Sequence, residues 1–225
     1  MVRIWTALAA TCLTLSACTE AVPTDNSARI LAMGDSMMAW NSTGKKSVSH
    51  NVERLLGEPV VDRSVSGARM LYAPPISGAL GLDITQQYQE GDWDWVIVNG
   101  GGNDLWMGCG CRRCDTKIQK LIGKNGAGGT VPGLISKIRA RGARVVYVGY
   151  LRSPGVDSMI DHCGPAGDEF ERRVALMADA DPGVYFVSLA DLVPHGDRSY
   201  HKADMVHPTA KASRAIAERV TRVMR

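Results

Sequence analysis

Hydrophobic and polar positions alternate in blocks along most of this chain, and the blocks predict strands and helices in turn. Five short runs rich in β-branched or aromatic residues are predicted to be strands: 29–33, 59–63, 93–99, 144–150 and 184–189. Apolar residues at helical spacing predict helices between and after them: 47–56, 83–89, 130–141, 168–178 and 209–224. In the last of these, Ile216, Val220 and Val223 share one face. Such apolar strands, separated by helices, are typical of a parallel sheet covered on both sides, so we expect one three-layer α/β/α domain.

Small residues and residues with reactive side chains follow the predicted strands. Gly34-Asp35-Ser36-Met37 follows the first strand, Ser66-Gly67-Ala68 the second, and Gly100-Gly101-Gly102-Asn103-Asp104 the third. Asp204-Met205-Val206-His207 comes after the last strand. In sheets of this kind, ligands bind beyond the carboxyl ends of the strands, so we expect these segments to meet around one site.

The residue types in these segments are those that acyl transfer requires. Ser36 is the candidate nucleophile, and His207 is the candidate base that would remove its proton. Asp204, three residues before His207, can accept a hydrogen bond from the imidazole and hold the ring toward the serine. The backbone N–H groups of Ser36 and Gly67 and the side-chain amide of Asn103 are the candidate oxyanion hole.

Four blocks in this order resemble the SGNH/GDSL hydrolase superfamily. The four residues that give that superfamily its name correspond to Ser36, Gly67, Asn103 and His207, and Met37 stands where the GDSL motif has leucine. The resemblance extends over essentially the whole domain. It implies a flavodoxin-like fold and an esterase, lipase, acyltransferase or thioesterase that needs no metal and no cofactor. The segment 108–129, rich in cysteine and glycine, matches none of the blocks.

We therefore expect a serine esterase with the triad Ser36, His207 and Asp204, acting through an acyl-enzyme. An acyltransferase with the same site and a sugar or alcohol acceptor is one alternative, and a non-catalytic glycan-binding lipoprotein is another. Taken alone, Ser36 would be interpreted as a helix N-cap.

A metal site is a further alternative for the C-terminal block. His201, Asp204 and His207 follow one another at intervals of three residues, and two imidazoles with a carboxylate could coordinate a metal ion. This interpretation is less favoured because it leaves Ser36 and Asn103 without a role.

The first residues resemble an export signal. Arg3 is followed by an apolar run, 4–15, which is too short to span a bilayer and suits a secretory signal. Leu15-Ser16-Ala17-Cys18 resembles the lipobox of bacterial lipoproteins, which implies cleavage before Cys18 and lipidation of its thiol. We expect a signal peptide over 1–17, a lipidated terminus and tether over 18–28, and the hydrolase domain over 29–225. Ordinary secretory cleavage nearby is the alternative.

Export changes the expected state of the cysteines. With Cys18 lipidated, four remain in the domain: Cys109, Cys111, Cys114 and Cys163. In an oxidising compartment an even number favours two disulfides, whose connectivity the sequence leaves open, and a four-thiolate zinc site is the competing interpretation. Three of the cysteines follow the third strand and Cys163 follows the fourth, so a bridge between these loops is expected to brace one wall of the cleft.

Composition limits the possible partners. The 225 residues carry 26 basic and 23 acidic side chains, a net charge of +3 without a block of like charges, which argues against a nucleic-acid partner. No apolar run is long enough for a membrane channel. The expected partners are a small-molecule or glycan-borne acyl ester and, through the lipid anchor, the membrane. We expect a monomer located in the bacterial cell envelope.

Overall fold

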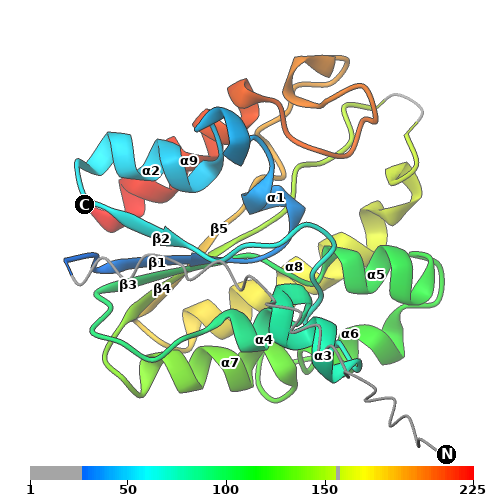
Figure 1. The fold of residues 1–225 in the computed structure, drawn as a ribbon. Coiled ribbons are helices and arrows are strands. Elements are labelled where there is room, and N and C mark those ends of the chain that lie inside the picture. Colours follow the sequence, from blue (N-terminus) through cyan, green and yellow to red (C-terminus); the bar gives the residue numbers. More distant parts are fainter. Residues whose placement is uncertain (1–26, 156–157) are drawn as a thin grey trace, which may run out of the picture.

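Five parallel strands form one sheet at the centre of the computed structural model, which describes residues 27–155 and 158–225 (Figure 1). The strands are β1 (Ile30–Met33), β2 (Val60–Asp62), β3 (Trp95–Val98), β4 (Arg144–Val148) and β5 (Val184–Val187). Their order across the sheet is β2-β1-β3-β4-β5, and every neighbouring pair is parallel. This is the flavodoxin-like order, and all five strands lie within the ranges that the sequence predicted.

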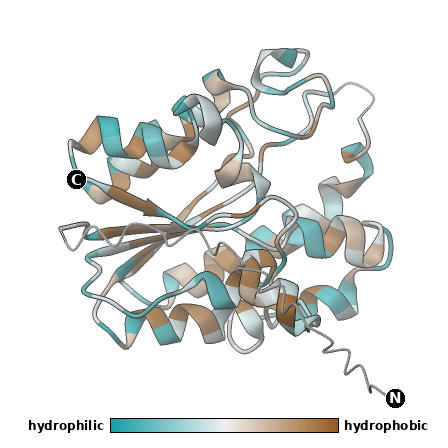
Figure 2. Ribbon diagram, in the orientation of Figure 1, coloured by the Kyte–Doolittle hydropathy of each residue, from teal (hydrophilic) through white to brown (hydrophobic). Residues whose placement is uncertain are grey.

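The sheet is buried on both faces, as its apolar strands require. Ile30 and Ala32 of β1 pack into one hydrophobic layer, whereas Leu31 and Met33 pack into the other. This division follows from the alternation of side chains along a strand. Figure 2 shows the same pattern, with hydrophobic strands inside and hydrophilic positions on the outer sides of the helices.

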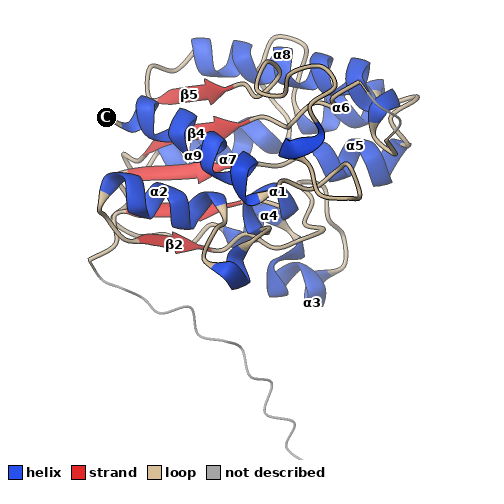
Figure 3. Ribbon diagram, turned by 90° about the horizontal axis from the view of Figure 1, so that it is seen from above, coloured by secondary structure: helices blue, strands red, loops and turns tan. Residues whose placement is uncertain are grey.

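Two long helices cover the first face of the sheet. These are α2 (Val48–Leu56) and α9 (Ala210–Met224), which pack against each other (Figures 1 and 3). Side chains accept hydrogen bonds at both helix starts: Ser47 from the N–H of His50, and Thr209 from the N–H of Ala212. Such N-caps satisfy helix donors that otherwise lack a partner.

The second face is covered by the helices of the middle of the chain. They are α4 (Ile84–Gln87), α5 (Gly102–Cys109), α6 (Asp115–Leu121), α7 (Thr130–Arg139) and α8 (Gly164–Asp179). The sequence pattern predicted α4, α7 and α8 but gave no indication of α5 and α6. Glycines and cysteines interrupt the apolar spacing between 102 and 121, so these two helices depend on packing and crosslinking more than on local pattern.

Short helical turns complete the connections. They are α1 (Ser36–Ala39), η1 (Ser42–Gly44), α3 (Pro75–Ser77), the π-helical turn η2 (Gly78–Leu82), η3 (Asp161–Cys163) and η4 (Arg198–Tyr200).

Two disulfides crosslink the second helical layer. Cys109 pairs with Cys114 across the turn between α5 and α6, and Cys111 of the same turn pairs with Cys163 at the end of η3. Both expected disulfides are therefore present, and the structure selects one of the three possible connectivities. The four sulfur atoms are bonded in pairs and not arranged as a four-thiolate site.

The expected signal peptide (1–17) and lipidated Cys18 lie outside the described residues. Within the ranges given above, no helix combines the length and the hydrophobicity needed to cross a bilayer.

The two disulfides should contribute unequally to stability. Closing a longer loop restricts the unfolded chain more, so a separation of 52 residues (Cys111–Cys163) should give about 4 kcal/mol and one of five (Cys109–Cys114) about 2 kcal/mol. Urea unfolding of the Cys111→Ala/Cys163→Ala and Cys109→Ala/Cys114→Ala variants measures both contributions. Equal losses, or a larger loss for the short loop, would contradict this account.

Candidate active site

A cavity of about 120 Å³ lies at the carboxyl ends of the strands, where the expected site residues converge. Four stretches of chain contribute most of its lining: 35–37 after β1, 102–106 in α5, 150–153 after β4, and 206–208 before α9. In the sheet, β2 lies on one side of β1, and β3, β4 and β5 lie on the other. The strand order therefore reverses at β1, and sheets of this topology bind ligands at such a switch point.

Ser36 begins α1 directly after β1. Gly34 makes the turn between them possible, since a Cβ there would lie 2.8 Å from the backbone oxygen of Asn99. The side-chain amide of Gln87 holds this turn on both sides, accepting from the Gly34 N–H at 2.7 Å and donating to its carbonyl at 3.0 Å. The Ser36 hydroxyl makes no hydrogen bond within the described ranges, and it lines the cavity together with His207.

His207 is held by Asp204 through both its ring and its backbone. The ring Nδ1 lies 2.7 Å from one carboxylate oxygen of Asp204, and the His207 N–H donates to the other at 3.0 Å. Partial burial acts to raise the pKa of Asp204, but the hydrogen bonds from His207 and Val206 outweigh it and lower the pKa. Asp204 is therefore ionised at neutral pH and orients the imidazole so that Nε2 remains available.

Two residues just after Ser36 bind the segment that carries His207. The indole of Trp40 stacks on the imidazole, with ring centroids 3.8 Å apart and planes 7° from parallel. The side-chain nitrogen of Asn41 donates to the carbonyl of Pro208 and to the hydroxyl of Ser213, each at 3.0 Å. These contacts hold the segment after α1 against the segment that leads into α9, beside the cavity.

Asn103 and Gly67 lie on adjoining segments. The side-chain nitrogen of Asn103 donates to the carbonyl of Ala68 at 3.0 Å, and an amide nitrogen carries a second N–H that this bond leaves available. Gly67 has a φ of +82°, which favours glycine, and a Cβ there would meet open space. Asn103 lines the cavity, while Gly67 lies outside its lining. Among the residues that the structure describes, the N–H groups of Ser36 and Gly67 have no backbone or side-chain acceptor.

Asp104 fixes the loop after β2. Its two carboxylate oxygens accept from the N–H groups of Met70 and Leu71, at 2.9 and 2.8 Å. Burial raises the pKa of Asp104, and these two hydrogen bonds lower it in part. The aspartate of the third block thus positions the loop that contains Gly67.

Asp35 is a buried carboxyl group beside Ser36. One oxygen caps α1 by accepting from the N–H of Met37 at 2.9 Å, and the other lies 2.6 Å from the hydroxyl of Tyr150. Burial raises the pKa of Asp35 to about 6, although the hydrogen bonds from Tyr150 and Met37 act against this. Asp35, and not Ser36, is thus the N-cap of α1, and it also contacts Tyr150, which follows β4.

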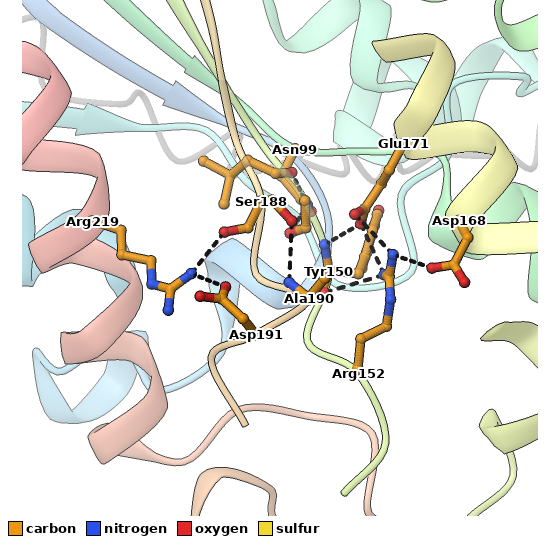
Figure 4. A network of polar contacts seen from close by, with 11 residues as sticks. Asn99, Tyr150, Arg152, Asp168, Glu171, Ser188, Ala190, Asp191 and Arg219 are labelled. Carbon is orange, nitrogen blue, oxygen red and sulfur yellow. Dashed lines mark hydrogen bonds and ion pairs between the residues drawn. The ribbon is translucent and has the colours of Figure 1, made fainter. Parts of the chain in front are cut away.

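The single cation in the cavity lining of the described chain is already paired. Figure 4 shows Arg152 between two acids: its guanidinium donates to both oxygens of Glu171 at 2.9 Å and to Asp168 at 2.7 Å. Glu171 is buried and also accepts from the N–H of Tyr150. The network fastens the loop after β4 to α8.

The C-terminal histidines are not arranged as a metal site. His201 is buried at 4% exposure, and neither ring nitrogen has a hydrogen-bond partner among the residues described. His207 and Asp204 contact each other, but the ligand atoms of His201, Asp204 and His207 do not all lie within 4.8 Å of one another. His201 forms a backbone bridge with Pro208 instead, which stiffens the loop that presents His207.

Four residues help to build this site although the sequence does not predict their contacts: Gln87, Asn41, Tyr150 and Trp40. The only local hint is that Trp40 and Asn41 follow the Gly-Asp-Ser block closely. Their partners are 115 to 172 positions away or lie in a different element, so only the folded chain identifies the contacts.

Comparison with known proteins identifies the family. The sequence model of the GDSL-like lipase/acylhydrolase family matches residues 32–215. The chain therefore belongs to this family and is a hydrolase that acts on esters. No curated protein matches the sequence.

Solved structures share the fold at low sequence identity. A protein from Slackia heliotrinireducens assigned to the SGNH hydrolases has a TM-score of 0.59 at 23% identity, covering 88% of this chain and all of that one (100%). A GDSL-like lipase from Bacteroides thetaiotaomicron has a TM-score of 0.58 at 16% identity, covering 91% of each chain. The lipase Lip_vut3 from a goat rumen metagenome has a TM-score of 0.57 at 18% identity, with 87% and 96% covered.

The buried Asp35 should make stability depend on pH. Its unfolded pKa is near 4 and its folded pKa about 6, so the stabilisation present below pH 4 is lost as the pH rises through 6, about 3 kcal/mol in all. Asp35→Asn keeps a capping oxygen and removes this proton, so its unfolding free energy should decline less between pH 4 and pH 7. Urea unfolding at both pH values measures the difference.

A variant of Tyr150, which donates a hydrogen bond to Asp35, should change the pH dependence of stability in the opposite sense. Tyr150→Phe removes a hydrogen bond that lowers the pKa of Asp35, so the decline between pH 4 and pH 7 should become larger. Wild-type pH dependence in both variants would contradict the assignment.

Asn41 should matter for activity through the position of His207. Asn41→Gly tolerates the left-handed backbone (φ 69°) but loses both hydrogen bonds, so we expect ester hydrolysis to fall about tenfold because His207, the candidate base, is displaced. Ser213→Ala is the matched control, since it removes one acceptor and keeps the bond to Pro208. Equal effects of the two variants on kcat/KM would show that the Pro208 contact is unimportant.

Proposed function

We propose that this member of the GDSL-like lipase/acylhydrolase family is a serine esterase in which Ser36, His207 and Asp204 form the catalytic triad. The observation that carries the proposal is the shared cavity. Ser36 and His207 line it from opposite ends of the chain, and the imidazole is held by Asp204 at 2.7 Å. Hydrogen bonds between nucleophile and base commonly tighten when substrate binds, so sharing one cavity is the relevant criterion here.

The reaction would proceed in two halves. Ser36 Oγ attacks the ester carbonyl carbon while Nε2 of His207 takes its proton, and the tetrahedral intermediate collapses when His207 returns that proton to the leaving alcohol. A water molecule then attacks the acyl-enzyme with His207 again as base, which releases the acid and restores Ser36. Asp204 supports the imidazolium that forms in each half without itself becoming protonated.

The oxyanion would be stabilised by three donors. They are the N–H of Ser36, the N–H of Gly67 and the remaining side-chain N–H of Asn103. The two backbone donors have no other acceptor in the described structure, and the bond from Asn103 to Ala68 keeps its amide next to Gly67. One such donor typically accounts for about 2.7–4 kcal/mol of transition-state stabilisation.

Trp40 and Asn41 would act as positioning residues for His207. Stacking restricts rotation of the imidazole, and an aromatic face favours the cationic ring that forms during the reaction. The Asn41 bond to Pro208 fixes the backbone beside it.

We further propose that the enzyme works at the cell envelope as a lipoprotein anchored through Cys18. The lipobox-like Leu15-Ser16-Ala17-Cys18 supports this location, as do the two disulfides, which persist in oxidising compartments.

Labelling with a fluorophosphonate probe tests the nucleophile. The wild-type protein should become labelled and should hydrolyse a simple aryl acetate, whereas Ser36→Ala should lose labelling and at least about 10³-fold of its activity. His207→Ala should lose a similar factor, because removing one triad member leaves only the residual catalysis of the others.

Two results would count against the mechanism. One is ester turnover that persists in both Ser36→Ala and His207→Ala. The other is turnover abolished by a chelator and restored by a divalent metal, which would favour the His201, Asp204 and His207 alternative.

A further inference from the structure

The Cys111–Cys163 disulfide is part of the cavity wall. Both cysteines line the cavity, Cys111 from the turn after α5 and Cys163 from η3. Neither element carries Ser36 or His207, so the crosslink joins two other walls of the same cavity. The second disulfide, Cys109–Cys114, lies in the same turn but outside the lining.

The volume of the cavity limits the acyl group that can be buried. An apolar protein cavity of about 150 Å³ holds one benzene molecule, so the 120 Å³ here suit an acyl group of about four carbons. The apolar neighbours include Leu105, Trp106 and Ile160. The methylene groups of a longer acyl chain would have to pass the crosslinked wall or remain in water. In water they do not contribute the free energy that burying apolar surface provides.

The charges around the cavity disfavour an anionic acyl group. Arg152 is paired with Glu171 and Asp168, so its positive charge is more than compensated. The cavity lining contributes two further acids, Asp35 and Asp161, and no other lysine or arginine of the described chain lines it. A carboxylate placed here would lose hydration without gaining a cation.

We propose that the Cys111–Cys163 disulfide closes the acyl pocket of this esterase and restricts its substrates to esters of short, uncharged carboxylic acids. The inference rests on the proposed function, because it takes Ser36 as the residue that becomes acylated. The disulfide is a specificity determinant and contributes no chemistry to the reaction.

A series of p-nitrophenyl esters from acetate to octanoate tests the proposal. For the full chain, kcat/KM should rise to butyrate and then fall at hexanoate and octanoate. In Cys111→Ala/Cys163→Ala, the octanoate-to-butyrate ratio should rise at least about tenfold, the gain expected from burying two further methylene groups. Cys109→Ala/Cys114→Ala is the matched control and should keep the wild-type profile.

A second variant distinguishes an enlarged cavity from a general loss of stability as the cause of a changed profile. Ile160→Ala enlarges the lined cavity and leaves both disulfides in place, so it too should shift the profile toward longer chains. All assays are run below the unfolding transition of the least stable variant.

Charge is tested with two acyl groups of equal length. The hemisuccinate ester matches the butyrate ester but ends in a carboxylate, and its kcat/KM should be about 100-fold lower because the pocket offers no free cation. Equal turnover of the two esters would overturn the charge argument.

The possible results distinguish failure of this inference from failure of the proposed esterase function. If labelling and turnover depend on Ser36 but the profile is the same in all variants, the disulfide is not the specificity determinant and the esterase assignment stands. If wild type prefers octanoate, the short-acyl assignment is wrong. If turnover does not depend on Ser36, the proposed function fails, and the inference fails with it.

Discussion

The site depends on the contact between the turn after Ser36 and the segment that carries His207. These parts of the chain are about 170 residues apart, and the sheet alone brings only the first of them to its edge, since His207 lies beyond the last strand. Stacking of Trp40 on the imidazole and the hydrogen bonds from Asn41 bind the C-terminal segment at that point. Asp204 then sets the ring orientation locally. Without this contact, Ser36 and His207 would lie on two loops that no other hydrogen bond or ring stack among the described residues holds together at the cavity.

Two buried carboxyl groups lie in the segments that follow β1 and β3. Asp35 and Asp104 are almost fully buried, and burial raises the pKa of each. Ionised groups in such places lower stability unless they are paired, so they are usually retained for what they position. Asp35 connects the serine turn to Tyr150, and Asp104 connects α5 to the loop that holds Gly67. Each of the two acids therefore connects segments that follow two different strands.

The crosslinked turn between α5 and α6 carries none of the proposed triad residues Ser36, Asp204 and His207. Its Cys111, bonded to Cys163 of η3, forms part of the cavity wall. In the function and inference proposed above, chemistry and selectivity belong to separate parts of this fold. The segments after the strands hold Ser36 and Asn103, and the crosslinked turn lines the cavity beside them through Cys111. Substrate differences within a family can arise this way without any change at the reactive residues.

Much of the architecture could be predicted from the sequence, because burial on both faces leaves a pattern that can be read along the chain. The strand at 95–98, the long helix before the C-terminus and the parallel sheet follow from it, and the resemblance of the blocks around Ser36, Gly67, Asn103 and His207 to a known superfamily implied the flavodoxin-like fold and the site. The helices α5 and α6, the disulfide connectivity and the contacts of Trp40, Asn41 and Tyr150 could not be predicted. A hydrophobic pattern records which face of an element is buried, whereas these features depend on which distant residue lies opposite, and only the folded chain determines that distance.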